Sequence, residues 1–597
     1  MRNTTSQRNP DSNGSRFSHC LLAALGVLAG YVFLCAYFDP STSTGMVNGT
    51  LNMVIYFLSL VILFICALVI IWKGPKKWTY ILGGSALWTL AGTICIPRLF
   101  EQTAASFMVF GIASLCIAAL VLLFTGTMTW LRGIMLIIAA GFVMRIGYGM
   151  SMPVFVGGHD YGIGSTLENS DGHAAYIAFI VENHALPSIG DLPGQSLAQF
   201  YNPPLHHIIC ALVYIVQNHL GFSYLRYAES LQFLVATYSC LFLLVWYKLF
   251  RQLGLKKLGL LIPVLVLAFH PSGWIIGNCL NNDMLTWLLV SLCLLYLVKW
   301  YREPGIKNIL IMAFSLGLAM MTKLSAVTVA PVIAVVFLYK IIKKDAAAPL
   351  QETWLDRFKR LIGQFAAFAV VSIPLGIWHS VRSLIKFGQP LGYVPALSQE
   401  SAQYIGDIPF LKRLFYFDFN VLFSSPFVSW YEGGDYSVFG KILKTSLFIE
   451  WAATWEHSYG LILPYALTIV NYLLVAFSLA AIVYVVMKLR KRRAERGPFL
   501  MAALYFFILI GSQIIFAYQY PHQCTNDIRY ILPCICIGLL FIGKMCQLTS
   551  ANKRPKPGCG HGVVRISAPA AVTLVLSVLF SVCSMTIYIL NAFNWTF

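Results

Sequence analysis

The sequence has few charged residues. Only 11% of its 597 residues are Asp, Glu, Lys or Arg, whereas about 25% is usual for a soluble protein. No long polar stretch is present that would form a separate soluble domain, because apolar blocks recur from Leu21 almost to the C-terminus. The fifteen cysteines include no CxxC pair, and many lie inside apolar blocks, where they are expected to pack as small apolar residues. These absences argue against a soluble enzyme and against a zinc-stabilised domain.

The sequence contains instead a series of apolar blocks long enough to cross a bilayer. We predict an all-α polytopic transmembrane bundle of about fifteen spans, each needing roughly 20 apolar residues. Residues 1–18 are predicted to be a cytoplasmic tail, and 19–132 hold four additional N-terminal spans. The main region is 133–548, and 549–597 form a basic loop and the last span. The predicted spans are 20–37, 51–73, 79–97, 107–124, 133–152, 229–250, 257–277, 284–300, 308–321, 324–341, 360–379, 461–487, 498–518, 531–547 and 567–590.

The net charge of +19 would suit a nucleic-acid partner, but its distribution does not. The basic clusters lie in short gaps between apolar blocks, which is the positive-inside pattern. A cytoplasmic N-terminus places all these gaps inside, provided that 205–216 is not a span. We therefore interpret 205–216, which follows Pro203-Pro204, as an interfacial or re-entrant helix. The chain is predicted to be a multi-pass integral membrane protein that binds no nucleic acid. The basic residues predicted to be inside include Lys76, Lys77, Arg251, Lys256, Lys257, Arg302, Lys307, Lys343, Lys344, Arg490, Arg492 and Lys553.

Nine of the twelve histidines and most of the acidic residues lie on or near the predicted outer side, whose large loops are 153–204 and 380–460. Within the first loop, Tyr176 and its apolar neighbours recur at helical spacing, which predicts a short amphipathic helix at the interface. Two carboxylates flank it: Asp160, which follows Gly157-Gly158-His159, and Asp171, which precedes Gly172-His173. A carboxylate at the membrane boundary suits a base that takes a proton from a hydroxyl. The alternatives are an ordinary loop role for Asp160 and helix N-capping by Asp171.

Several motifs resemble the protein O-mannosyltransferase and aminoarabinose-transferase superfamily, whose members are polytopic glycosyltransferases of the GT-C fold. The matching segments are the acidic first loop ending in QFYNPPLHHI, Asn281-Asn282-Asp283, LGLAMMTKLSA with Lys323, and NDIRYILP with Arg529 and Tyr530. They cover about residue 145 to about residue 548. The Asp-Glu pair and the HPPLGK motif of protein O-mannosyltransferases are absent, so the likeness is closer to bacterial members with undefined acceptors.

The resemblance implies inverting transfer of a sugar from a polyprenyl-phosphate donor to a glycan, lipid or protein acceptor outside the cytoplasm, in a bacterial plasma membrane. It implies that Asp160 or Asp171 is the catalytic base. A divalent metal is left open, and the adjacent His206-His207 pair is not expected to share one, because neighbouring helical residues point in different directions. Residues implied to hold the lipid phosphate are Lys323, Arg529 and Arg382, and candidates for substrate binding are His159, His173, Tyr176, His206, Asp283 and Glu456.

Each of these side chains also has a simpler interpretation. Lys323 would be a snorkelling lysine, Arg529 would pair with Asp527, and Asp283 would cap a helix. The aromatic residues near Glu456 would anchor the chain at the interface. The alternative function is a transporter or flippase of lipid-linked sugars. Transporters place ionisable groups near the bilayer midplane and often carry internal repeats; no repeat is evident here, and the candidate residues lie at the outer boundary.

Overall fold

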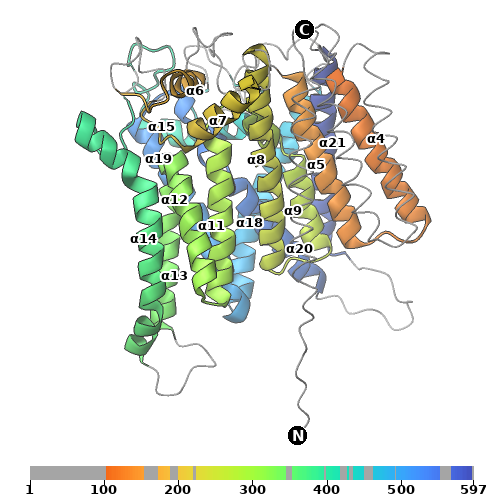
Figure 1. The fold of residues 1–597 in the computed structure, drawn as a ribbon. Coiled ribbons are helices and arrows are strands. Elements are labelled where there is room, and N and C mark those ends of the chain that lie inside the picture. The colour runs from red at the N-terminus through yellow and green to blue at the C-terminus, as the bar shows by residue number, and fades with distance from the viewer. Residues whose placement is uncertain are drawn as a thin grey trace.

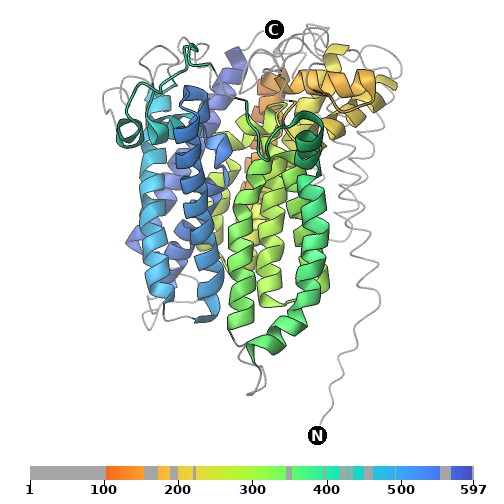
Figure 2. The ribbon, with the colours of Figure 1, turned by 90° about the vertical axis from the view of Figure 1, so that its left-hand side faces the viewer.

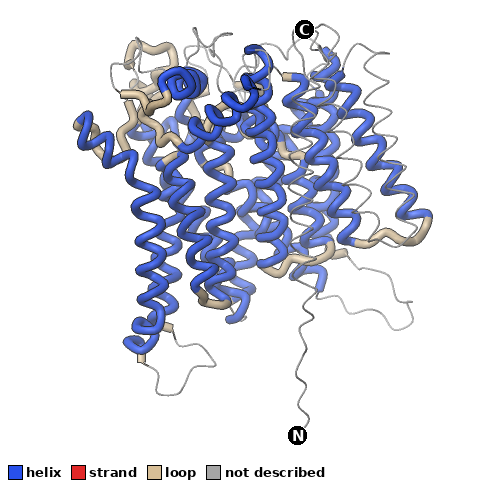
Figure 3. Tube along the Cα trace, in the orientation of Figure 1, coloured by secondary structure: helices blue, strands red, loops and turns tan. Residues whose placement is uncertain are grey.

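The structure is a computed structural model, and Figure 1 shows its fold. It describes residues 103–152, 172–188, 200–219, 224–343, 353–395, 398–416, 426–428, 435–448, 462–490, 493–551 and 566–594. Within these ranges the chain is helical, and Figure 3 shows the helices joined by short loops. The only β-pairing there is an isolated antiparallel bridge between Tyr404 and His522. The all-α prediction is therefore confirmed.

The helices follow one another with few residues between them. From the N-terminal side they are α4 (Thr103–Phe124), α5 (Trp130–Ser151), α6 (Gly172–Asn183), α7 (Leu205–His219), α8 (Tyr224–Gln252), α9 (Leu258–Ala268), α10 (Pro271–Ile275), η1 (Ile276–Asn278), α11 (Asp283–Arg302), α12 (Ile306–Thr322), η2 (Leu324–Val329) and α13 (Ala330–Ile342). They continue as α14 (Trp354–Phe387), α15 (Phe410–Phe415), α17 (Val438–Thr445), α18 (Ile462–Leu489), α19 (Arg493–Gln519), η4 (Gln523–Thr525), η5 (Ile528–Tyr530), α20 (Pro533–Ala551) and α21 (Ala568–Asn594).

Nine helices of the described part are long and apolar enough to cross a membrane, and a bent pair adds a tenth. All ten coincide with predicted spans. The predicted spans 107–124 and 308–321 correspond to α4 and α12, whose apolar stretches are shorter. The predicted spans 20–37, 51–73 and 79–97 lie outside the described residues.

The helices run alternately up and down, so the turns between them gather at two ends. Figures 1 and 2 show α6, α7 and α15 together at one end, which we call the α6–α7 end. The turns α8–α9, α11–α12 and α13–α14 lie at the opposite end, and they carry the basic residues Arg251, Arg302 and Lys343. The positive-inside rule predicts that this opposite end is cytoplasmic and that the α6–α7 end faces outward.

The predicted span 257–277 is broken in the structure. Helix α9 ends before His270-Pro271, and the following segment turns by 53°. Breaking a helix inside a bilayer frees carbonyl groups that need donors. Arg145, fully buried on α5, supplies them: its guanidinium donates to the carbonyls of Leu267 and Ala268 at 3.2 and 2.8 Å. The break reorients the chain that leads through η1 toward Asp283 at the α6–α7 end.

Candidate functional site

Two cationic side chains meet on one aromatic ring at the α6–α7 end. Lys323 directly follows α12, and Arg529 lies in η5 beside Tyr530. The Lys323 Nζ and the Arg529 Cζ each lie 5.1 Å from the centroid of the Tyr530 ring. The guanidinium Nη2 of Arg529 also donates a hydrogen bond to the Tyr530 hydroxyl, at 3.2 Å. Cation–π attraction thus holds both positive charges close together.

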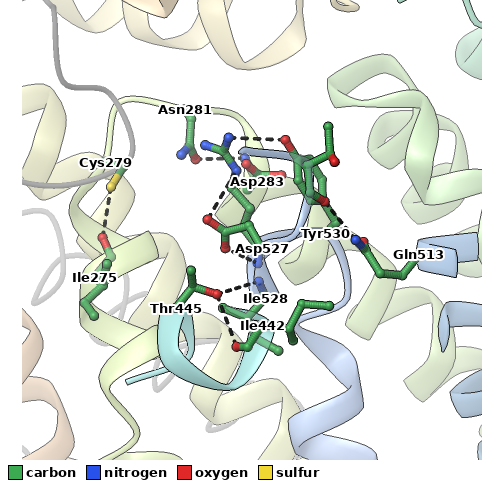
Figure 4. A network of polar contacts seen from close by, with 12 residues as sticks. Ile275, Cys279, Asn281, Asp283, Ile442, Thr445, Gln513, Asp527, Ile528 and Tyr530 are labelled. Atoms are coloured by element: carbon green, nitrogen blue, oxygen red, sulfur yellow. Dashed lines mark hydrogen bonds and ion pairs between the residues drawn. The ribbon is translucent and has the colours of Figure 1, made fainter. Parts of the chain in front are cut away.

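Each cation has an acidic neighbour. The Lys323 Nζ donates to Asp283 Oδ1 at 2.5 Å, and the Arg529 Nε lies 4.0 Å from Asp527 Oδ2. Asp527 also accepts a hydrogen bond from the Arg529 backbone N–H at 2.9 Å. We call these five residues the cation cluster; Figure 4 shows Asp283 beside Asp527 and Tyr530, which both come from the loop before α20. Its two positive and two negative charges balance.

Neighbouring elements fix the backbone of the cluster. The Trp287 indole N–H on α11 donates to the Arg529 carbonyl at 2.6 Å, and the Asn282 side chain donates to the Thr322 carbonyl at 2.8 Å. The Ile528 N–H donates to the Thr445 hydroxyl at 3.1 Å, which ties η5 to α17. The start of α11, the end of α12 and the loop before α20 are therefore held as one unit.

The cations of the cluster are more accessible than its acids. Side-chain exposure is 19% for Lys323 and 15% for Arg529, but only 2% for Asp283 and Asp527. Burial raises the pKa of the Tyr530 hydroxyl well above its usual value, so it stays protonated. An anion that approaches from the α6–α7 end meets positive charge first.

A pair of histidines lies near the cluster. The Nδ1 of His173, at the start of α6, lies 2.9 Å from the Nε2 of His207 on α7. The His207 ring stacks on Tyr176 with centroids 4.0 Å apart, and the Tyr176 hydroxyl donates to the Asn202 carbonyl. The adjacent His206 points elsewhere, with its Nε2 3.1 Å from the Leu280 carbonyl. The two neighbours on α7 thus join it to α6 and to the segment before α11.

These imidazoles are neutral. Burial, helped by the positive charges of Lys323 and Arg529, holds the pKa of His173 well below its usual value. Burial and the surrounding imidazoles do the same for the pKa of His207. Burial lowers the pKa of His206 to about 4, against the opposing effects of the Leu280 carbonyl and Asp283.

The structure brings three of the predicted site residues into contact or near contact, namely Lys323, Arg529 and Asp283. The Asp283 carboxylate bonds Lys323 and not a backbone amide of α11, so the capping interpretation is wrong. Asp527 lies beside Arg529, as predicted from the sequence, and Arg529 also contacts the Tyr530 ring. Sequence reasoning missed the cationic pairing on Tyr530 and the His173–His207 pair, because no local spacing connects these positions.

Of the other predicted site residues, His173, Tyr176 and His206 are described above, Arg382 contacts backbone carbonyls, and four lie outside the described residues. Arg382 on α14 donates to the carbonyls of Leu186 and Pro187 at 3.3 and 3.2 Å, so it holds the chain that follows α6. Among the residues that the structure describes, no three His, Cys, Asp or Glu side chains converge in a way that would hold a metal ion. The predicted site residues His159, Asp160, Asp171 and Glu456 lie outside the described residues.

The chain is similar to several solved structures. No family model and no curated protein matches the chain. Among solved structures, the oligosaccharyltransferase AglB from Archaeoglobus fulgidus, in complex with an inhibitory peptide and a dolichol-phosphate, is 12% identical with a TM-score of 0.45. That match covers 78% of this chain and 56% of AglB. ArnT from Cupriavidus metallidurans, bound to undecaprenyl phosphate, is 14% identical with a TM-score of 0.41 and 77% coverage of both chains.

Both neighbours are GT-C transferases, the superfamily that the sequence motifs resemble. This chain spans little more than half the length of AglB. TM-scores below 0.5 leave the likeness at a coarse level, so the function proposed below rests on the residues of the cation cluster.

Proposed function

We propose that the protein is a membrane glycosyltransferase that moves a sugar from a polyprenyl-phosphate donor to an extracytoplasmic acceptor. The observation that carries the proposal is the partly exposed pair of cations, Lys323 and Arg529, held on Tyr530 at the predicted outer end of a membrane bundle. A lipid phosphate at the membrane boundary needs fixed positive charge at this depth, and arginine offers a planar fork for its oxygens.

The proposed reaction is a single in-line displacement that inverts the anomeric centre. The acceptor oxygen forms a bond to the anomeric carbon, and the bond from that carbon to the phosphate oxygen breaks, leaving its electron pair on the phosphate. Asp160 takes the hydroxyl proton, with Asp171 as the alternative base. Lys323 and Arg529 stabilise the charge that develops on the leaving phosphate.

The other predicted residues have supporting roles in this proposal. Arg382 is a third candidate for the lipid phosphate, and whether the reaction uses a divalent metal is left open. We propose that the sugar or acceptor is contacted by His159, His173, Tyr176, His206, Asp283 and Glu456.

One observation favours a second function, a flippase of lipid-linked sugars. The α9–α10 break resembles the discontinuous helices of transporters, and Arg145 is a buried cation beside it. The hydrogen bonds of Arg145 to backbone carbonyls and to Ser239 give it a structural role, however, and the accessible cations lie at the end of the bundle. The transferase is therefore the better supported proposal.

The test uses purified protein in nanodiscs with a panel of radiolabelled polyprenyl-phospho-sugars. We expect transfer, or slow donor hydrolysis, that is lost in Asp160→Asn or Asp171→Asn. The matched control is Asp407→Asn, which neutralises an exposed carboxylate at the α6–α7 end outside the cluster and should retain activity. Binding of a lipid-linked sugar without turnover of any donor, together with its movement across vesicles, would favour the flippase.

A further inference from the structure

The His173–His207 pair has a feature that substrate contact alone does not explain. The two rings are close enough to share a proton, at 2.9 Å between Nδ1 and Nε2. Both residues are buried; His207 is fully enclosed, whereas His173 retains 9% exposure. We propose that this pair holds the proton released by the acceptor hydroxyl while the leaving phosphate carries its second negative charge. This inference rests on the proposed function.

Charge balance gives the reason for a proton store. A sugar-linked lipid phosphate is a diester with one negative charge, whereas the lipid phosphate that leaves is a monoester with close to two. The four charged side chains of the cation cluster already sum to zero, because Lys323 and Arg529 are balanced by Asp283 and Asp527. The reaction therefore adds a negative charge beside the cluster and releases one proton in the same step.

The geometry assigns a place to that proton. In the tautomer in which His173 Nδ1–H donates to His207 Nε2, the His173 Nε2 lone pair is left to accept the proton. The resulting imidazolium keeps its hydrogen bond to a neutral His207, whose ring is fixed by stacking on Tyr176.

The surrounding groups make the pair respond to an anion. In the free protein, burial and the nearby cations keep the pKa of His173 well below its usual value, so the pair is neutral. A doubly charged phosphate at Lys323 and Arg529 reverses that field and raises the pKa of His173. The described titratable groups around the pair include Tyr176 on α6, His206 and Cys210 on α7, His379 and Arg382 on α14, and Asp283, Lys323 and Arg529 of the cation cluster.

Proton uptake on phosphate binding tests the proposal. Binding of undecaprenyl phosphate to full-length protein in nanodiscs is measured by calorimetry in two buffers of different ionisation enthalpy, from pH 7 to 8.5. Above pH 7 the ligand's own second proton, with a pKa of about 6, is largely lost. We expect wild type to take up about one proton and to lose affinity by about tenfold per pH unit.

Variants identify the proton site. His173→Gln and His207→Gln should bind the phosphate with no proton uptake and a flat pH profile. The matched control is His219→Gln, an exposed histidine on the same helix as His207, which should behave like wild type. Nitrogen-15 histidine spectra of wild type provide a readout that needs no variant: one imidazolium signal should appear when the phosphate binds.

The outcomes separate this proposal from the proposed function. If the phosphate binds in a way that depends on Lys323, yet wild type takes up no proton or His173→Gln takes up as much as wild type, the proton store is wrong and the transferase proposal stands. If wild type does not bind the phosphate at all, both are wrong.

Discussion

Among the buried or half-buried cations of the described residues, Arg145 and the pair Lys323 and Arg529 are built in different ways. Arg145 in the interior is fully buried and donates to Ser239 and to the carbonyls of Gly141, Leu267 and Ala268. Lys323 and Arg529 at the α6–α7 end remain partly exposed, lie beside acids and share one aromatic ring.

The difference shows how to tell a structural cation from a ligand-binding one in a membrane protein. A guanidinium saturated by backbone carbonyls satisfies a broken helix and has little left to offer a ligand. A cation that faces a carboxylate and retains access can exchange or share its partner with an incoming anion. This comparison leads to four predictions, from the largest effect to the smallest.

Replacing Arg145 by Met should have the largest effect, and it should act on folding. The carbonyls of Leu267 and Ala268 would lose their buried donor, and an unpaired buried polar group costs about 1–3 kcal/mol. We expect little monodisperse protein and a lower unfolding temperature, measured by fluorescence-detected size-exclusion and thermal unfolding. Arg145→Lys, which keeps the charge with fewer donors, should lie in between. A Met variant as stable as wild type would contradict the structural role.

Replacing Lys323 or Arg529 by Gln should impair phosphate binding and leave folding intact. A hydrogen bond to a charged group contributes about 1.5–3 kcal/mol, so each variant should bind undecaprenyl phosphate about 10- to 100-fold more weakly. The measurement is lipid binding in nanodiscs, with thermal unfolding alongside. Lys412→Gln, an exposed lysine on α15, is the control and should change neither quantity.

Replacing Asp283 by Asn should strengthen phosphate binding by a few-fold. The carboxylate neutralises Lys323, and partly exposed ion pairs of this kind contribute about 0.2–1 kcal/mol. Affinity for undecaprenyl phosphate is the readout, compared with the double variant Asp283→Asn, Lys323→Gln, in which the gain should disappear. Weaker binding in the single variant would show instead that Asp283 itself contacts the ligand or holds Lys323 in position.

Replacing Tyr530 by Phe should have an effect similar in size to that of Asp283→Asn and opposite in direction. The ring that both cations approach remains, and only the hydroxyl that accepts from Arg529 is lost, which is a net contribution of about 0.5–1.5 kcal/mol. We expect two- to tenfold weaker phosphate binding. Tyr530→Leu removes the ring as well and should be clearly worse, and equal affinity of the two variants would exclude the cation–π contribution.

The helices could be predicted from the sequence because their apolar blocks are separated by polar turns. The break in 257–277 was not predicted, although His270-Pro271 inside an apolar block was a visible signal for it. A hydropathy average hides a two-residue break of this kind. The structure shows that the freed carbonyls accept hydrogen bonds from Arg145.

The sequence could predict which residues belong to the site but not which of them contact one another. Lys323, Arg529 and Asp283 each stood out as an ionisable residue at the end of an apolar block. Lys323 and Asp283 are 40 residues apart, and Trp287 and Arg529 are 242 apart, so their pairing depends on how the helices pack. Neither this pairing nor the His173–His207 pair can be predicted from local spacing.

The arrangement of charges along the chain also has a consequence for biogenesis. Asp283 and Lys323 lie at the same end of the adjacent antiparallel helices α11 and α12, and Asp527 and Arg529 lie in one short loop. A lone charge at the bilayer centre costs about 2.5–3.5 kcal/mol on insertion scales. With the predicted orientation, the nascent chain delivers the cluster to the far side of the membrane as two electrically neutral pairs, first within a helical hairpin and later within a single loop.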